Sequence, residues 1–325
     1  MKYISLFSGI ESASAAWEPL GWNPVCFAEI EPFPRAVLAH RFPNVPLHDD
    51  MRQVDWHQYR DQADVVVAGA PCQAFSVAGA RQSLDDDRGN LTLATLEALN
   101  AIRPEFFLFE NVPGILSTKD NAFGCFLAGL VGAGAPLQPP GRCRWTDAGL
   151  VSGPDRRVAW RILDAQHFGV PQRRRRVFVV GCPRTGADPA EILFEKNKRG
   201  VHFTAIRKEK KKITFDSVED FKKSGRKIIT INAREDPIFI YDKSLPIGKM
   251  DMGHAFIDFS SSHPKARRLT PTECERLQGF SDGWTQVPYR NKPAADGPRY
   301  KALGNAMAVP LIRWLGERIG AQYER

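Results

Sequence analysis

The segment Ala63–Ser76, ADVVVAGAPCQAFS, decides the predicted fold. Its first half is a short apolar run rich in valine, which is typical of a strand buried on both faces. Gly69 and Pro71 end that run, so Cys72 is placed on a loop at the carboxyl end of the strand. Ligands and catalytic groups gather at this edge in open α/β sheets. Cys72 is therefore a candidate for chemistry, although a single cysteine is more often inert apolar packing.

Predicted strands and helices alternate on both sides of this segment. This alternation indicates an α/β protein with a doubly wound, mostly parallel sheet. Two later apolar runs indicate a hairpin, and two amphipathic helices follow near the end of the chain. The predicted strands are Tyr3–Phe7, Pro24–Ile30, Glu105–Phe109, Val158–Ala165 and Arg176–Gly181; the predicted helices are Glu11–Leu20, Phe33–Phe42, Leu91–Ile102, Ala122–Val131, Thr270–Gln278 and Val309–Ile319.

Length and composition fit one large core with a smaller second domain. The chain has 325 residues, of which 43% are hydrophobic and 25% are charged, as in ordinary globular proteins. No secretory signal or apolar run of membrane-spanning length is visible, so we expect a cytoplasmic protein with no membrane partner. The six cysteines are scattered without a CxxC pair, so we expect neither a metal site nor disulfide bonds.

The positive charge is concentrated in one segment. Lys196–Lys227 holds 12 Lys and Arg against 4 acidic residues, an excess that equals the net charge of +8 of the whole chain. The helix–strand alternation also stops between Cys182 and Lys265, so we predict an inserted domain at 182–265 between catalytic segments 1–181 and 266–325. The basic segment indicates either a surface for a polyanion such as nucleic acid or a solvated tether.

Several predicted strands end at one edge of the sheet with groups suited to a nucleoside. The turn FSGIES has one glycine and lacks the G-x-G-x-x-G pattern, which disfavours a nicotinamide dinucleotide. Glu29 follows the second strand, where a carboxylate can accept both ribose hydroxyls, and Phe7 can pack against adenine. The alternative for Glu29 is a solvated charge at the start of a helix.

Cys72 and Glu110 form the pair with the clearest chemistry. A thiolate that adds to C6 of cytosine makes C5 nucleophilic, and a carboxylic acid that protonates N3 assists the addition. The alternative for Glu110 is a helix cap or a salt bridge. Arg174 and Arg176 share one face of the predicted strand that follows Gln172, where they indicate an anionic partner or a basic surface patch.

These segments together resemble the DNA cytosine-C5 methyltransferases of bacteria and bacteriophages. The resemblance covers Lys2–Gly181 and Arg267 to the end of the sequence, with the blocks in the family's order. Glu11 stands where the family usually has a second glycine, and Ala70 where a first proline is common. The matching blocks are FSGIE, FAEIE, GAPCQAFS, ENV at Glu110–Val112, QRRRR at Gln172–Arg176, RRLTPTECERLQGF at Arg267–Phe280 and YKALGNAM at Tyr300–Met307.

The resemblance implies a role for each matching residue. Cys72 is the nucleophile, Glu110 the acid at N3, and Arg174 and Arg176 orient the base and its phosphate. The loop Gly79–Leu91 closes over the site. The cofactor is S-adenosylmethionine, and the residues implied to hold it are Phe7, Gly9, Glu29, Ile30, Asp50, Pro71, Asn305 and Ala306.

The resemblance also implies a substrate and partners. The cytosine would be flipped out of double-stranded DNA, and the insert 182–265 would be the target-recognition domain. A monomer, an association with the nucleoid and a cognate restriction endonuclease are further expectations. RNA as the substrate, a catalytically decayed nucleic-acid-binding relative, and a nucleotide-dependent oxidoreductase remain as alternatives; the missing glycines disfavour the last.

Overall fold

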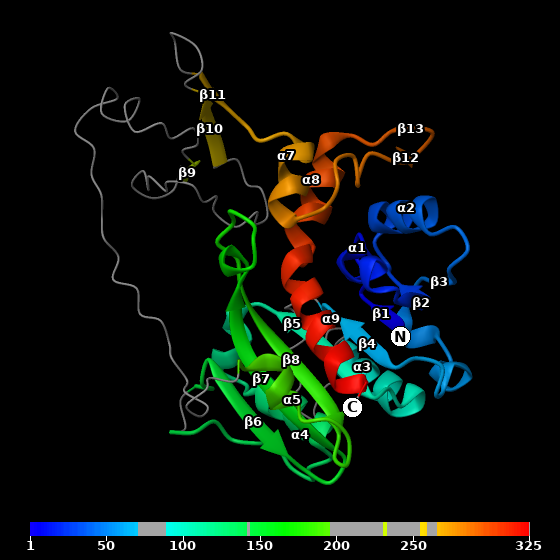
Figure 1. Cartoon of the computed structure of the whole chain (residues 1–325), viewed down its shortest axis with the longest axis vertical. Coiled ribbons are helices and arrows are strands. Elements are labelled where there is room, and N and C mark those ends of the chain that lie inside the picture. The colour runs from blue at the N-terminus through cyan, green and yellow to red at the C-terminus, as the bar shows by residue number, and fades with distance from the viewer. Residues whose placement is uncertain (71–88, 142–143, 196–229, 233–253, 259–264, 325) are drawn as a thin grey trace, which may run out of the picture.

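The structure is a computed structural model that describes residues 1–70, 89–141, 144–195, 230–232, 254–258 and 265–324 (Figure 1). The α-helices are α1 (Ser12–Trp17), α2 (Pro32–Arg41), α3 (Gly89–Ile102), α4 (Ala122–Val131), α5 (Pro189–Leu193), α7 (Pro271–Gln278), α8 (Asp296–Asn305) and α9 (Val309–Tyr323). The strands of the main sheet are β1 (Lys2–Leu6), β2 (Asn23–Ala28), β3 (Leu47–His48), β4 (Val65–Ala68), β5 (Phe106–Asn111), β6 (Ala148–Ser152), β7 (Arg156–Asp164) and β8 (Arg175–Pro183).

The main sheet has eight strands in the order β3-β2-β1-β4-β5-β8-β7-β6. The first five are parallel, and β8, β7 and β6 continue the sheet in antiparallel fashion. The predicted doubly wound, mostly parallel sheet is confirmed, as is the hairpin formed by β7 and β8. Strand β6 was not predicted, because its five residues AGLVS are short and only partly buried.

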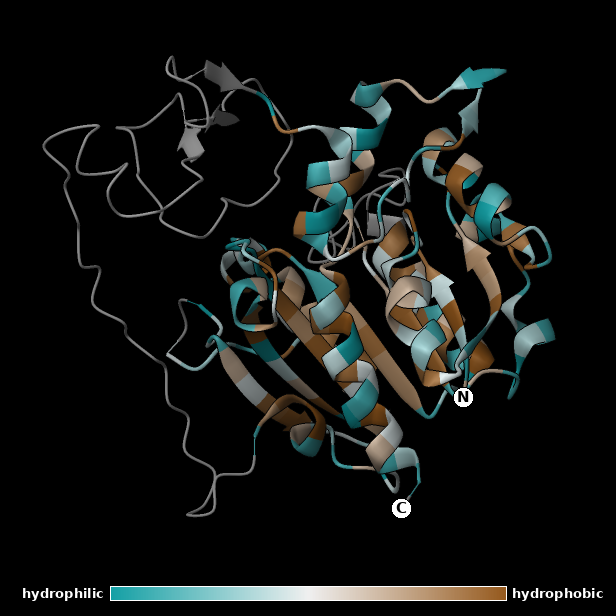
Figure 2. Ribbon diagram, turned by 45° about the horizontal axis from the view of Figure 1, so that its top comes forward, coloured by the Kyte–Doolittle hydropathy of each residue, from teal (hydrophilic) through white to brown (hydrophobic). Residues whose placement is uncertain are grey.

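Helices cover both faces of the sheet. Along β4, Val65 and Val67 face one hydrophobic cluster with α1, α2, α5 and α9, whereas Val66 and Ala68 face a second cluster with α3 and α4. The central strands are mostly brown in Figure 2, which marks hydrophobic residues. The continuous valine run therefore exists because each side of β4 is buried under a helical layer.

The register aligns the carboxyl ends of the central strands. Leu6 of β1 pairs with Ala28 of β2 and with Ala68 of β4, and Ala68 pairs with Phe109 of β5. The residues that follow these strand ends therefore lie at one edge of the sheet. The strand order reverses between β1 and β4, and this switch point is where doubly wound sheets bind ligands.

Two helices near the end of the chain form a unit above this edge. Helix α7 begins at Pro271 with a capping box, in which Thr270 and Glu273 satisfy each other's backbone amides. Helix α8 was not predicted, since Gly297 and Pro298 in its first turn interrupt the helical pattern. Figure 1 shows α7 and α8 side by side at the end of the molecule where α1 and α2 also lie.

Helix α9 packs on α1, the helix that follows the first turn at the sheet edge. The indole nitrogen of Trp17 donates to the carbonyl of Ile312 at 3.0 Å. The predicted helix Glu11–Leu20 is α-helical only to Trp17 and continues as a 3-10 turn, because Pro19 has no amide to donate. Gly316 of α9 lies directly against the Trp17 ring.

The segment predicted as an insert is described only in part. Its strands β9 (Thr230–Asn232) and β10 (His254–Asp258) form a separate antiparallel sheet with β11 (Lys265–Arg267), which begins at the last residue of the predicted insert. Its first residues lie against the main sheet, since Ile192 and Leu193 of α5 are buried in the core and Arg318 of α9 donates to the carbonyl of Phe194 at 2.6 Å. The domain division at 182–265 stays a prediction. The basic segment Lys196–Lys227 lies outside the described residues.

The close packing of α9 on Trp17 can be tested with two glycines of the same helix. An added Cβ at Gly316 would lie 2.6 Å from Trp17 Cδ1, whereas one at Gly320 would lie 3.6 Å from Trp22. We expect Gly316→Ala to lower the free energy of unfolding by about 1–3 kcal/mol through overpacking. The control Gly320→Ala should raise it by up to about 1 kcal/mol, because alanine favours the helix. Urea unfolding measures both, and equal effects would contradict the packing.

Candidate active site

The first turn at the sheet edge, Phe7–Glu11, has an unusual backbone. Phe7, Gly9 and Glu11 all have left-handed φ angles, of 54°, 57° and 65°. Such angles cost a non-glycine residue roughly 1–3 kcal/mol unless the surroundings hold them. Here the amide of Ser8 donates to the carbonyl of Ala28 at 3.0 Å, and the amide of Glu11 donates to the carbonyl of Ser8 at 3.0 Å. The turn is thereby fixed against the end of β2.

Glu29 holds the same turn from the neighbouring strand. One carboxylate oxygen accepts from the amide of Gly9 and the other from the amide of Glu31, both at 2.7 Å. Burial raises the pKa of Glu29, and these two amides oppose the shift. A carboxylate has about four acceptor positions, so each oxygen can accept one more hydrogen bond. Glu29 is thus a positioned acceptor pair and not a solvated charge.

The surroundings of Glu29 leave room on the exposed side of the turn. Ile30 leaves 61% of its surface exposed, and an added Cβ at Gly9 would meet nothing within 4 Å. An exposed branched apolar side chain next to a fixed carboxylate suits a base that stacks while its sugar is hydrogen-bonded. Phe7, which follows β1, is half-buried at the same edge.

Asp50 lies beyond β3, next to a hollow that His48 and Gln53 also line. Hydrogen bonds from the side chain and amide of Arg52 lower the pKa of Asp50, which stays ionised and also caps the following 3-10 turn. Its carboxylate therefore already has one cationic partner, with Arg52 Nη2 at 2.6 Å.

Glu110 and Asn111 meet the strand that leads to the predicted nucleophile. An added Cβ at Gly69 would lie 3.9 Å from Glu110 Oε2, and the side-chain amide of Asn111 donates to the carbonyl of Ala70 at 3.1 Å. Ala70 is two residues before Cys72. Both Cys72 and Pro71 lie outside the described residues, as does the predicted closing loop up to residue 88.

The two predicted arginines differ sharply in their surroundings. Arg176 lies at the start of β8 and places its Nε 3.0 Å from Glu110 Oε1. Arg174 is only 2% exposed, and its guanidinium donates to the carbonyl of Gly304 at 3.1 Å. Burial, with the neighbouring charge of Arg176, lowers the pKa of Arg174 to about 9. Arg176 is therefore the arginine beside the carboxyl, and Arg174 links β8 to α8.

Asn305 and Ala306 lie at the end of α8, on the side of the turn Phe7–Glu11. Lys301 of the same helix forms an ion pair with Glu31 at 2.8 Å, and Arg174 holds Gly304. Asn305 is exposed and Ala306 is buried. The structure thus brings Phe7, Gly9, Glu29, Ile30, Glu110, Arg176 and the end of α8 to one edge of the sheet.

Residues that support this site were missed by the sequence interpretation. The hydrogen bond from the side chain of Asn111 to the carbonyl of Ala70 was not predicted, although Asn111 belongs to the ENV block. Gln172 is fully buried and donates to the carbonyl of Leu277 in α7 at 3.2 Å. These are contacts between side chains and distant backbone carbonyls, which no local pattern in the sequence signals.

Glu11, where the family usually has glycine, is the most strained and buried acid of the site. It has a left-handed backbone, is 1% exposed, and neither carboxyl oxygen accepts a hydrogen bond of good geometry among the described residues. Burial raises the pKa of Glu11 to about 8, and the nearby Ser14 amide and Ser5 hydroxyl lower it by less. Glu11 therefore keeps its proton at neutral pH.

The described residues show two absences. None of the groups of His, Cys, Asp and Glu in the described ranges could hold a metal ion. Among the helices that the structure describes, none has the length and apolar character needed to cross a membrane.

The fold belongs to a known structural class. The structure resembles the crystal structure of S. pombe Dnmt2 methyltransferase with a TM-score of 0.65, at 18% identity and over 100% of both chains. It also resembles a putative DNA modification methyltransferase from an E. coli prophage, with a TM-score of 0.59, at 17% identity and over 100% of both chains. The architecture is that of the S-adenosylmethionine-dependent methyltransferases.

The sequence defines the family within that class. The C-5 cytosine-specific DNA methylase family matches residues 1–241 and 195–321, so the chain belongs to this family. The expected family is confirmed, and with it an enzyme class that uses S-adenosylmethionine. Type II methyltransferase M.HpaII of Haemophilus parainfluenzae is 28% identical over 98% of this chain and 88% of its own length. M2.BsuMI of Bacillus subtilis is 27% identical over 98% of this chain and 75% of its own length.

One similar protein carries a different name. The "DNA N-6-adenine-methyltransferase" of Escherichia phage P1 is 38% identical over 98% of this chain. The chain spans 61% of the length of that protein. Because the alignment extends over 460 positions, the phage P1 protein contains long stretches with no counterpart in this 325-residue chain.

The buried carboxyl of Glu11 predicts a pH dependence of stability. Its pKa is about 8 in the folded chain and near 4.5 when unfolded, so the unfolded chain loses this proton first as the pH rises. The free energy of unfolding should therefore fall between about pH 4.5 and 8, by up to about 1.4 kcal/mol per pH unit from this group. Glu11→Gln should remove that contribution to the slope, as measured by urea unfolding across this range.

Glu18→Gln is the matched control, because Glu18 is exposed at the end of the same helical segment and the substitution leaves Glu11 in place. An identical slope in Glu11→Gln and the unmodified chain would show that Glu11 does not titrate in this way.

Proposed function

We propose that this chain transfers a methyl group from S-adenosylmethionine to C5 of a cytosine flipped out of double-stranded DNA. The observation that carries the proposal is the meeting of two strand ends. Asn111 ties the approach to Cys72 to β5, and Glu110 lies at that point with Arg176 beside it. A pyrimidine ring placed there would face a carboxyl with a cation beside it, and Cys72 follows Ala70 by two residues in the sequence.

The reaction we propose begins with the thiolate of Cys72. It forms a bond to C6 while N3 takes a proton from Glu110, so the negative charge does not accumulate on the ring. The resulting enamine would then attack, through C5, the methyl group that S-adenosylmethionine supplies, and the S–CH3 bond would break to release S-adenosylhomocysteine. Water would accept the C5 proton while the Cys72–C6 bond breaks, which restores the C5–C6 double bond and returns the thiolate. N3 would give its proton back to Glu110. Proton donation of this kind typically contributes about 10²- to 10⁴-fold to a rate.

The residues at the cofactor turn fit the methyl donor. Glu29 would accept the ribose hydroxyls on its remaining acceptor positions, Ile30 and Phe7 would contact the adenine, and Asp50 would lie near its amino group. Asn305 and Ala306 would close the pocket from α8, with Pro71 bounding it from the nucleophile loop. When bound, S-adenosylmethionine supplies an activated methyl group on sulfur.

The proposal assigns different roles to Arg174 and Arg176. Arg176 would bind the base together with Glu110. Arg174 is nearly inaccessible and holds Gly304, so it would act on the base pocket by fixing α8 and not by reaching a phosphate. This assigns Arg174 a positioning role in place of the direct contact that the resemblance implied.

Adenine N6 is a second candidate acceptor, because the phage P1 relative is named for it. Methylation of an exocyclic amine requires no thiol adduct on the ring, so the groups around Glu110 favour cytosine. RNA is a further alternative to duplex DNA.

As partners we propose double-stranded DNA, read through the segment 182–265, and a restriction endonuclease for the same site, since several relatives are named Type II methyltransferases. We also propose that the chain acts as a monomer.

The proposed nucleophile predicts a covalent adduct. Duplex DNA that contains 5-fluorocytosine blocks the last step, because fluorine at C5 cannot leave as a proton. With S-adenosylmethionine present, we expect an adduct that survives denaturing electrophoresis and is absent in Cys72→Ser. Cys125→Ser is the control, since Cys125 is a free, partly buried thiol on α4, and it should form the adduct normally. Glu110→Gln should slow adduct formation by about 10²- to 10⁴-fold.

The outcomes separate the candidate functions. Mass spectrometry of nucleosides from normal DNA should find 5-methyldeoxycytidine. N6-methyldeoxyadenosine alone would favour the adenine reaction, and methylation of RNA but not of DNA would favour the RNA reaction. An adduct formed equally by Cys72→Ser would mean that another residue is the nucleophile.

The basic segment predicts a steep salt dependence of DNA binding. If about eight of its cations meet phosphates, the slope of log affinity against log salt is near −7. Replacing Lys211 and Lys212 with glutamine should make the slope shallower by about 2. Lys2→Gln with Arg60→Gln is the control, because both residues are exposed and lie at the amino ends of strands: Lys2 is the first residue of β1, and Arg60 precedes β4. Equal slopes for the two double variants, measured by fluorescence anisotropy, would assign the segment to a tether.

A further inference from the structure

Trp284 reaches the cofactor turn from a distant part of the chain. It lies between α7 and α8, and its indole nitrogen donates to the carbonyl of Ile10 at 2.8 Å. Both residues are buried, with 8% and 1% of their surfaces exposed. Ile10 sits between Gly9 and Glu11, two residues with left-handed φ angles. The indole therefore holds the peptide group at the centre of the strained turn.

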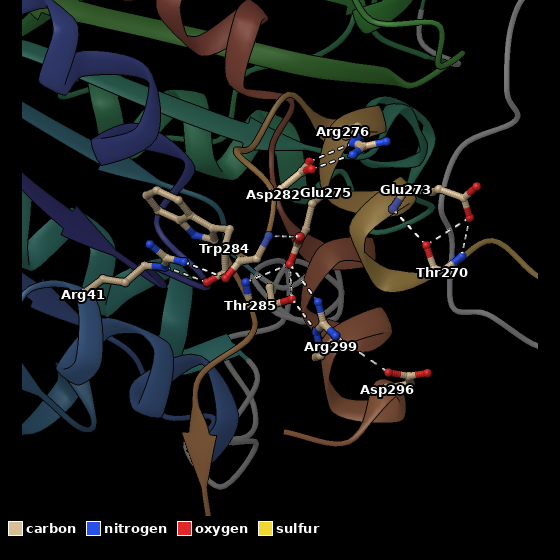
Figure 3. A network of polar contacts seen from close by, with 11 residues as sticks. Arg41, Thr270, Glu273, Glu275, Arg276, Asp282, Trp284, Thr285, Asp296 and Arg299 are labelled. Atoms are coloured by element: carbon tan, nitrogen blue, oxygen red, sulfur yellow. Dashed lines mark hydrogen bonds and ion pairs between the residues drawn. The ribbon is translucent and has the colours of Figure 1, made fainter. Parts of the chain in front are cut away.

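Helix α2 fixes Trp284 in this position. The guanidinium of Arg41 lies 4.1 Å from the centre of the indole ring, close enough for a cation–π interaction. The same guanidinium donates from Nε to the carbonyl of Trp284 at 2.6 Å and from Nη2 to that of Gly283 at 2.8 Å. Figure 3 shows Arg41 directed at Trp284 from one side, with the polar contacts of Glu275, Thr285 and Arg299 on the other.

Glu275 of α7 fixes the backbone on both sides of Trp284. Its carboxylate is fully buried and accepts from the amide of Gly283 at 2.7 Å and from that of Thr285 at 2.8 Å. Arg299 of α8 neutralises it at 3.2 Å and donates from Nε to Thr285 Oγ1 at 2.8 Å. A buried carboxylate with this many donors is costly to disturb, so the loop that carries Trp284 has little freedom.

From this arrangement we infer that Trp284 is a positioning residue for cofactor binding, which sets the conformation of the turn Phe7–Glu11 through the Ile10 carbonyl. The turn also donates hydrogen bonds to the end of β2: the amide of Ser8 donates to the carbonyl of Ala28, and the amide of Gly9 donates to the carboxylate of Glu29. Without the indole donor, a buried carbonyl loses its partner and the left-handed residues lose a constraint. The tryptophan thus joins the α7–α8 unit to the site that the proposed function assigns to S-adenosylmethionine.

The test compares two tryptophans that make the same kind of hydrogen bond. Trp284→Phe keeps an aromatic ring and removes the donor. Trp160→Phe is the control, because Trp160 is also buried and donates to the carbonyl of Thr146 at 2.9 Å in the other hydrophobic cluster. For Trp284→Phe we expect the Kd of S-adenosylmethionine, measured by calorimetry on the full chain, to rise by about 3- to 10-fold. Trp160→Phe should leave it unchanged at temperatures where both variants are folded.

A second measurement does not depend on the cofactor. Hydrogen exchange of the amides of residues 9–12, followed by mass spectrometry, should become about 3- to 10-fold faster in Trp284→Phe and remain unchanged in Trp160→Phe. Unchanged exchange at the turn, or equal acceleration in both variants, would overturn the inference. If the unmodified chain binds no S-adenosylmethionine, the proposed function fails, whereas the exchange result still decides the role of Trp284.

Arg41→Met is a second test of the role of Trp284, and it leaves the indole in place. It removes the two hydrogen bonds and the charge that hold Trp284, so exchange at the turn should accelerate in the same direction by a smaller factor. The effects of Arg41→Met and Trp284→Phe should be less than additive in the double variant, because both act through one contact. Full additivity would show that Arg41 acts on the turn by another path. Should Trp284→Phe fail to fold, an unchanged turn in Arg41→Met would itself contradict the inference.

Discussion

The hydrogen bonds from Gly9 and Glu31 to the Glu29 carboxylate are the constraint on which the rest of the site depends. The bond from Gly9 ties the end of β1 to the end of β2, next to the point between β1 and β4 where the strand order of the sheet reverses. The left-handed turn can then persist with only one glycine, because its peptide groups are held by neighbouring elements. A single carboxylate thus shapes the turn and still offers acceptors to a ligand.

The α7–α8 unit connects the two halves of this edge. On the side of β8, Gln172 donates to Leu277 and Arg174 donates to Gly304. On the side of β1 and β2, Lys301 pairs with Glu31, and Trp284 holds the turn. The same helices therefore fix both the segment beside the carboxyl Glu110 and the turn beside Glu29, so the distance between the two halves is set by a common support.

Much of this arrangement could be predicted from the sequence. The valine run before Cys72 predicted a strand buried on both faces, and the residues following the strands predicted the edge at which Glu29 and Glu110 lie. Strand β6 could not be predicted, because a half-buried edge strand of five residues has little pattern. The burial of Arg174 and the role of Asn111 depend on backbone carbonyls brought near by the fold, and such partners leave no trace in local sequence.

The contact between Trp284 and Ile10 joins residues 274 positions apart. While the chain emerges from a ribosome, the first strands can form their parallel pairs long before the tryptophan is synthesised. Until then the turn Phe7–Glu11 lacks the hydrogen bond from Trp284, and α8 has not been synthesised. A chain translated only as far as its first strands thus lacks the indole donor that holds the turn Phe7–Glu11 in the folded protein.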